Sequence, residues 1–141
     1  MNIFSAINHG AKYLKRKFIL SPYLDSEILM TKALKKNREY VLLNPKQYMK
    51  NEDFNYFQKL VKSRSHGKPI AYITNKKFFW NYNFYVTEDT LIPRPDTEII
   101  IENVLKLTKN KIKIKLLDIG IGSGCILLSL LKERQDFYGT G

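Results

Sequence analysis

Three glycines at alternate positions, Gly120, Gly122 and Gly124, constrain the fold of this chain more than any other feature of its sequence. They follow KIKIKLLDI, in which Lys alternates with Ile before the run turns apolar, as expected of a strand. They precede CILLSLLKE, which is predicted to be a helix. A strand that turns sharply into a helix over a ligand needs positive φ angles and a close backbone approach, and glycine permits both. The order strand, glycine loop, helix therefore predicts the first unit of a doubly wound α/β sheet.

The spacing of these glycines narrows what the loop would hold. It reads G-x-G-x-G, which is neither the G-x-G-x-x-G of dinucleotide folds nor a P-loop ending in Lys-Ser/Thr. Asp118 lies two residues before Gly120, at the carboxyl end of the strand, where open α/β sheets bind ligands. A carboxylate there suits the ammonium and sulfonium of S-adenosylmethionine better than a pyrophosphate. The pattern favours a methyltransferase, with another nucleotide binder or a purely structural glycine turn as alternatives.

Length and composition limit the number of domains and the class of protein to which the chain can belong. A chain of 141 residues holds one ordinary domain, or a small domain and part of another. With 44% hydrophobic and 26% charged residues it resembles soluble globular proteins. No apolar run is long enough to span a bilayer and no signal peptide pattern is present, so we expect a cytoplasmic protein without membrane contact. Cys125 is the only cysteine, which excludes an internal disulfide and a cysteine-rich zinc site.

The positive charge is concentrated in the first half of the chain. Residues 1–67 hold thirteen Lys and Arg against five Asp and Glu, whereas residues 68–141 hold eleven against eight, within a net charge of +11. Solvated helix faces explain such an excess, and so does a contact surface for a polyanion. A non-catalytic module that binds RNA or an acidic protein partner is therefore an alternative function.

Residues 1–67 are predicted to form a small helical bundle. In SPYLDSEILMTKALKKN, Ser21 is placed to cap a helix and Pro22 to occupy its first turn. In NEDFNYFQKLVKSRSHG, Asn51 is the expected cap and Gly67 the stop. Weaker helical patterns cover residues 3–18 and 38–43.

Residues 68–88 are predicted to be a β-hairpin linker. The segment PIAYITNKKFFWNYNFYVT is rich in β-branched and aromatic residues, and NYN at 81–83 is a plausible turn between arms at 77–80 and 84–87. Its aromatics are interleaved with Lys76 and Lys77, a combination that allows stacking on the bases of single-stranded nucleic acid. The alternative is a hydrophobic connector between two domains.

The last part of the chain, residues 89–141, begins with a rigid segment. In LIPRPDTE, two prolines flank Arg94 and restrict the backbone on both sides of it. A helix is expected to begin near residues 96–98 and to end near Leu107.

The segment GKPIAYITNKKFFWNYNFYVTEDTLIPRPDTE, followed by LLDIGIGSGCILLSLL, resembles the release-factor glutamine methyltransferases, the HemK/PrmC family. The resemblance covers the whole chain. It is weak in the helical part, strong in the connector and LIPRPDTE, and good in the glycine loop. A sister family that methylates a ribosomal protein usually has Pro-Arg-Ser-Pro at this place, so Arg-Pro-Asp-Thr-Glu fits the release-factor branch better.

The resemblance implies an α+β chain in two parts. A helical domain at 1–67 would help to grip the substrate, a hairpin linker at 68–88 would follow, and 89–141 would be the start of a class I, Rossmann-like methyltransferase domain. The implied reaction moves a methyl group from S-adenosyl-L-methionine to the glutamine amide nitrogen in the Gly-Gly-Gln motif of peptide chain release factors. The partner is then a release factor in translation termination, and nucleic acid is not the direct substrate.

The resemblance also assigns a cofactor site, while it assigns neither a metal site nor a catalytic residue within these 141 residues. His9 and His66 are interpreted as surface residues, and Cys125 as a packing residue. Two departures from the family, Asn75 in place of Gly and Asn81 with Tyr82 in place of Trp-Gly, affect the hairpin. The implied cofactor-binding residues are Arg94, Pro95, Asp118, Gly120, Ile121, Gly122, Ser123 and Gly124.

A larger departure concerns the reaction itself. In the family, the next strand ends in an acid that binds the ribose, and an Asn-Pro-Pro-Tyr loop holds the substrate amide; neither occurs in these 141 residues. We therefore expect the N-terminal half of a family protein, whether a fragment or one part of a split enzyme completed by a separate C-terminal polypeptide. By itself this chain is expected to be inactive and to bind S-adenosylmethionine in the millimolar range at best.

Overall fold

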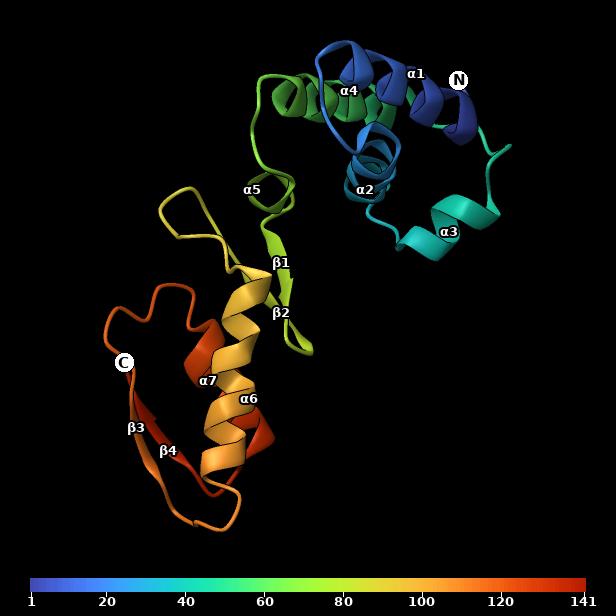
Figure 1. Cartoon of the computed structure of the whole chain (residues 1–141). Coiled ribbons are helices and arrows are strands. Elements are labelled where there is room, and N and C mark those ends of the chain that lie inside the picture. The colour runs from blue at the N-terminus through green and yellow to red at the C-terminus, as the bar shows by residue number, and fades with distance from the viewer. The chain divides into compact units, whose positions relative to one another are not determined.

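The computed structural model describes all residues from 1 to 141, and the chain divides into two compact units, Met1–Thr74 and Asn75–Gly141 (Figure 1). The chain contains seven α-helices and two small sheets of two strands each, which confirms the predicted α+β class. None of the helices is both long enough and apolar enough to span a membrane.

The first unit is entirely helical apart from one isolated bridge between Asn2 and Tyr48. The four helices predicted in residues 1–67 are confirmed. Its helices are α1 (Ile3–Arg16), α2 (Pro22–Leu34), α3 (Arg38–Leu43), α4 (Asn51–Ser65) and α5 (Ile70–Thr74).

α5 corrects the sequence prediction, because Ile70–Thr74 lies within the predicted β-hairpin linker and is a helix. The backbone N–H groups of Tyr72 and Ile73 both donate to the carbonyl of Pro69, which opens the helical turn. Ile73 is buried in the same core as the other helices of the unit. Tertiary packing thus overrides the β-propensity of this short segment.

The core of the first unit is formed where α1, α2 and α4 meet. Leu14, Leu29 and Phe57 lie in its centre and are almost completely buried. Gly10 permits the close approach of the three helices, because a Cβ at this position would lie 2.7 Å from Ser26 Oγ and 2.9 Å from Phe57 Cζ. Ser26 Oγ also donates to the carbonyl of Ile7 over 2.9 Å and so links α2 to α1.

The N-terminal caps of α2 and α4 differ from the sequence prediction in detail. Ser21 stands at the N-cap of α2, yet its hydroxyl donates to Asp25 Oδ1 over 2.9 Å and caps no backbone N–H. Asn51 is the first residue of α4, and Lys50 is its cap. Asp25 is only 4% exposed, so its carboxylate has to find hydrogen-bond donors within the protein, whereas water can bond to the exposed end of the helix.

The second unit begins with the hairpin and continues with helices and a parallel strand pair. The helix expected near residues 96–107 and the order strand, glycine loop, helix are confirmed. Its elements are β1 (Lys76–Phe79), β2 (Tyr82–Tyr85), the 3-10 helix η1 (Pro95–Thr97), α6 (Glu98–Leu107), β3 (Lys115–Leu117), α7 (Cys125–Glu133) and β4 (Tyr138–Thr140).

The antiparallel hairpin of β1 and β2 is present, but its turn is tighter than the sequence suggested. Phe79 pairs with Tyr82, so the turn consists of Trp80 and Asn81 rather than residues 81–83. Trp80 has the positive φ of 57° that tight hairpin turns of the primed types require at their first position. The arms are correspondingly shifted toward the N-terminus.

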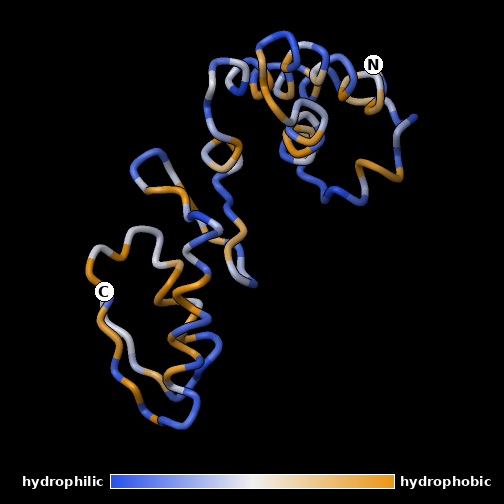
Figure 2. Tube along the Cα trace, viewed as in Figure 1, coloured by the Kyte–Doolittle hydropathy of each residue, from blue (hydrophilic) through white to orange (hydrophobic).

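β3 and β4 are parallel neighbours, with Lys115 opposite Tyr138 and Leu117 opposite Thr140. Parallel strands need a crossover connection, and α7 supplies it. The hydrophobic colouring of Figure 2 is strong along α7, whose inner face packs into the core of this unit. Buried residues of this core include Phe79, Phe84, Ile101, Cys125 and Leu130.

Candidate functional site

The glycine loop connects the end of β3 to the start of α7. Gly120, Gly122 and Gly124 have φ angles of 84°, 55° and 75°. All three therefore adopt the left-handed region that other residues rarely occupy, as the spacing of the glycines predicted. The last of them is the N-cap of α7, so the loop passes directly into the helix.

Two of the glycines face open space. A Cβ at Gly120 would meet no atom within 4 Å, and a Cβ at Gly122 would meet only the carbonyl oxygen of Gly120, at 3.8 Å. At Gly124 a Cβ would lie 3.0 Å from Leu128 Cδ1, which is tight packing against α7. The backbone of the first two glycines is thus accessible to a ligand, while the third glycine is required for contact with the helix.

Asp118 lies at the carboxyl end of β3, directly before this loop. Its backbone N–H donates to the carbonyl of Thr140 over 2.8 Å, which fixes the residue beside β4. Its side-chain oxygen Oδ2 is buried and has no hydrogen-bond partner. A buried acceptor without a donor is costly, and a ligand that offers an N–H or O–H group, or a positive charge, would relieve that cost.

Next to the loop lies an open hollow of about 720 Å³ between β2 and α7. Its volume falls in the range of about 300 to 1,000 Å³ typical of small-molecule sites. Ser123 is the member of the glycine loop that lines it. The other lining residues are Tyr82, Asn83, Phe84 and Tyr85 of β2, and Leu128, Leu131 and Lys132 of α7.

The remaining sequence-predicted residues are more scattered. Ile121 is 38% exposed within the loop. Arg94 and Pro95 are exposed at the start of η1, and neither lines the hollow beside Ser123. Their assignment as the edge of a cofactor site therefore remains a prediction from the resemblance.

A cluster around Glu133 was missed by the sequence analysis. Trp80 Nε1 donates to Glu133 Oε1 over 2.7 Å, and the Tyr82 hydroxyl donates to the same oxygen over 3.3 Å. Desolvation, and then the charge and hydrogen bond of Glu133, raise the pKa of Tyr82 above its ordinary value. No local pattern signals this cluster, because Glu133 is more than fifty residues away in sequence from both Trp80 and Tyr82.

The two histidines lie in the first unit. His9 is exposed on α1, and the Nδ1 atom of His66 is 2.7 Å from the carbonyl oxygen of Lys62. Nowhere in the structure do three or more His, Cys, Asp or Glu side chains lie close enough together to hold a metal ion.

The family model described as the PrmC N-terminal domain matches residues 5–74, which end where the first compact unit ends. A release factor glutamine methyltransferase of Shewanella oneidensis is 42% identical over 120 residues, which cover 85% of this chain and 42% of that protein. The protein of the same name in Leptospira interrogans is 38% identical over 140 residues, covering 99% of this chain and 49% of that protein.

A third relative, the release factor glutamine methyltransferase of Buchnera aphidicola subsp. Acyrthosiphon pisum, is 37% identical over all 141 residues and half of its own length. The chain thus spans about half the length of the curated relatives that it matches. Together these matches show that the chain belongs to the release factor glutamine methyltransferase family, its residues 5–74 corresponding to the PrmC N-terminal domain.

Proposed function

We propose that this chain contributes the substrate-gripping domain and the cofactor loop of a protein-glutamine methyltransferase. The methyl donor is S-adenosyl-L-methionine, and the acceptor is the side-chain amide nitrogen of the glutamine in the Gly-Gly-Gln motif of a peptide chain release factor. β3, the glycine loop, α7 and β4 are then the first unit of a Rossmann-like domain. Because the acceptor is a translation factor, the reaction takes place in the cytoplasm.

The observation that carries this proposal is the buried Asp118 Oδ2 without a partner, next to three glycines of positive φ. S-adenosylmethionine bears an ammonium and a sulfonium and no phosphate, so a lone carboxylate at the strand end matches its charge. The open space above Gly120 and Gly122 would let the cofactor approach the backbone. When bound, the cofactor supplies an electrophilic methyl group.

In this proposal the residues of the chain bind and orient the cofactor and the substrate, and activation of the acceptor nitrogen is assigned to none of them. An amide nitrogen is a poor nucleophile because its lone pair is delocalised into the carbonyl. Positioning and charge stabilisation therefore have to supply much of the rate. The Asn-Pro-Pro-Tyr sequence with which the family holds the amide does not occur among these 141 residues. We accordingly expect cofactor and substrate binding from this chain, without turnover.

The cofactor part of the proposal is tested by titrating S-adenosylmethionine into the 141-residue chain while amide NMR signals are recorded. We expect weak binding, in the millimolar range, with shifts at residues 118–124. Gly122→Val should abolish these shifts, because valine is strained at that φ and its side chain fills the ligand space. Asp118→Asn should weaken binding, because it removes the charge that faces the cofactor.

Gly67→Val is the matched control, since Gly67 also has a positive φ, of 90°, and open space around it, but lies in the first unit. This variant should bind the cofactor as the wild type does. Unchanged loop signals in the wild type, or equal loss of binding in Gly67→Val, would contradict the cofactor assignment. Micromolar binding abolished by Gly122→Val would support the site but overturn the expected weakness.

The substrate part is tested separately with a purified release factor. We expect the chain to bind it, and Gly122→Val to bind it equally, because gripping is assigned to the helical unit. Labelled methyl transfer by the chain alone should be undetectable. Clear turnover would show that the positioning loop of the family is not essential.

The positive charge of residues 1–67, thirteen basic against five acidic side chains, supports one alternative, a non-catalytic module that binds RNA or an acidic protein. A salt titration distinguishes the two functions. RNA binding that falls steeply with salt, together with no affinity for the release factor, would favour the alternative.

A further inference from the structure

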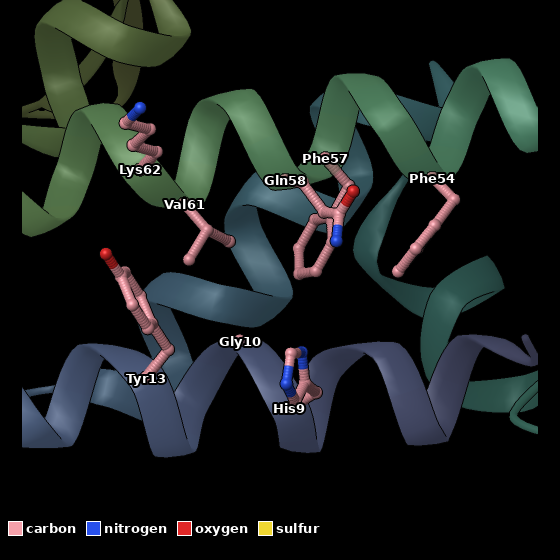
Figure 3. A pocket seen from close by; sticks show the side chains of 8 residues that line it. All are labelled: His9, Gly10, Tyr13, Phe54, Phe57, Gln58, Val61 and Lys62. Atoms are coloured by element: carbon pink, nitrogen blue, oxygen red, sulfur yellow. The ribbon is translucent and has the colours of Figure 1, made fainter.

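A groove between α1 and α4 in the first unit lies outside every residue assigned to methyl transfer. Its volume is about 210 Å³, and Figure 3 shows Phe54, Phe57 and Val61 of α4 pointing toward α1, while the ammonium group of Lys62 lies on the outer side of α4 in this view. We call it the α1–α4 groove. Its lining residues are His9, Gly10 and Tyr13 of α1, and Phe54, Phe57, Gln58, Val61 and Lys62 of α4.

The floor of the groove is apolar and well packed. Phe57 and Val61 are 2% and 5% exposed, and Gly10 is buried between the helices. A Cβ at Gly10 would lie 2.9 Å from Phe57 Cζ, so the absence of a side chain there lets the ring of Phe57 pack closely against α1. The floor offers no polar side chain that could pair with the edge of a nucleic-acid base, which disfavours RNA as the occupant.

The rim of the groove is polar and exposed. His9, Gln58 and Lys62 are exposed, and Tyr13 is 38% exposed. No Asp or Glu is among the lining residues. The rim therefore offers an ammonium group, an amide and a hydroxyl, which favour a carboxylate near the groove.

The volume decides what kind of group fits. Small-molecule sites usually enclose about 300 to 1,000 Å³, whereas 210 Å³ suits a single bulky side chain. Interfaces commonly use one buried anchor of this kind, surrounded by polar contacts that exclude water.

From this combination we propose that the α1–α4 groove is a docking site for one bulky apolar side chain in an acidic segment of a protein partner. The side chain packs on Phe57 and Val61, and a neighbouring carboxylate pairs with Lys62. The proposal rests on the substrate-gripping role proposed for the helical unit and deepens it, by naming the groove that grips and the chemistry of the segment that it takes. No residue of the glycine loop takes part in it. It therefore stands or falls independently of cofactor binding.

The test uses the full chain and a fluorescent synthetic peptide with one phenylalanine flanked on each side by two aspartates. We expect this peptide to bind with fluorescence anisotropy that saturates. Replacing its phenylalanine by alanine should weaken binding about tenfold, the cost of losing a buried anchor. Replacing its aspartates by asparagines should also weaken binding, because the rim then loses its ionic partner. Equal binding of the phenylalanine and alanine peptides would overturn the proposal.

Two matched variants locate the site. Lys62→Glu should weaken binding of the phenylalanine peptide at least about threefold, whereas Lys59→Glu should leave it nearly unchanged. Lys59 is exposed on the same helix and does not line the groove. An equal loss in both variants would reduce the effect to net charge and overturn the proposal.

Gln58→Trp is a third variant, chosen because Gln58 is exposed and its replacement should preserve the fold. The indole should occupy the groove and abolish peptide binding while the circular dichroism melt stays as in the wild type. Retained peptide binding in this variant would place the peptide elsewhere and refute the proposal. Oligouridylate that binds the wild type and displaces the peptide would show a nucleic-acid surface instead.

Discussion

The indole of Trp80 donates from Nε1 to Glu133 Oε1 over 2.7 Å, which joins the hairpin turn to the last residue of α7. The backbone N–H of Trp80 donates to Glu98 Oε1 over 2.8 Å, at the start of α6. Two carboxylates on two helices thus hold one turn residue. This arrangement positions β2 along α7 and shapes the hollow that Ser123 lines.

Removal of Glu133 should therefore loosen the hairpin. In Glu133→Ala, three donors lose a shared acceptor, and we expect a loss of about 1 kcal/mol in the free energy of unfolding of the second unit. Trp80 is the only tryptophan, so its fluorescence reports the change directly as a red shift. Glu102→Ala on α6 is the control, because Glu102 is exposed and the same charge is removed. Equal fluorescence spectra of the two variants would argue against this role of Glu133.

Asp25 and Arg64 should be the strongest polar link in the first unit. Their Oδ2 and Nε atoms are 2.7 Å apart, and the two side chains are 6% and 18% exposed. Asp25→Ala leaves the guanidinium without its anion, so we expect a loss of about 2 kcal/mol, less than for a fully buried pair. Urea unfolding followed by circular dichroism measures it.

The comparison for this prediction is a second ion pair of the same unit. Arg38 and Glu27 also lie 2.7 Å apart, but their side chains are 55% and 21% exposed. Glu27→Ala should cost less than about 1 kcal/mol. A Glu27→Ala loss as large as that of Asp25→Ala would show that burial does not set the strength of these pairs.

Asp136 should titrate at unusually low pH. The side-chain hydrogen bond from Arg134 is the largest cause that lowers the pKa of Asp136 from 3.8 to about 2. Desolvation, the second largest, opposes it, and the backbone N–H of Lys113 adds to the lowering. Because the folded-state pKa is the lower one, its stabilising contribution is present above pH 3.8 and disappears as the pH falls toward 2. A carboxyl NMR titration gives the midpoint, and Arg134→Gln should return it toward the ordinary value. A midpoint near 3.8 in the wild type would refute this.

Tyr82 should resist deprotonation. Its pKa is raised above 10.0, first by desolvation and then by the charge and hydrogen bond of Glu133. The contribution to stability is therefore complete below pH 10.0 and is lost as the pH rises through the folded-state pKa. Ultraviolet titration of the phenol checks this. Glu133→Gln should lower the midpoint, and an unchanged midpoint would leave desolvation as the sole cause.

The sequence alone determined the features that depend on local backbone chemistry. The positive φ angles of Gly120, Gly122 and Gly124 follow from what a sharp strand-to-helix turn demands of any residue. The helices of the first unit follow from their apolar spacing, and the α+β class follows from the order of the elements. These requirements act within a few residues of one another, so a linear pattern reveals them.

Tertiary structure decided what depends on distant partners. Ile70–Thr74 is a helix because Ile73 enters the core of the first unit, although its residues favour strands. The hydroxyl of Ser21 donates to the buried carboxylate of Asp25 and does not cap the backbone of α2. The hairpin turn is at Trp80 and Asn81, where Glu98 and Glu133 hold it.

The same division holds for the two candidate sites. The glycine loop could be found in the sequence, because strand, glycines and helix are contiguous. The unpartnered Asp118 Oδ2 and the α1–α4 groove could not, because burial and cavity shape arise only when separate elements pack. Contacts between residues far apart in sequence produce no periodic pattern along the chain. Which of these contacts form is decided only when the separate elements pack together.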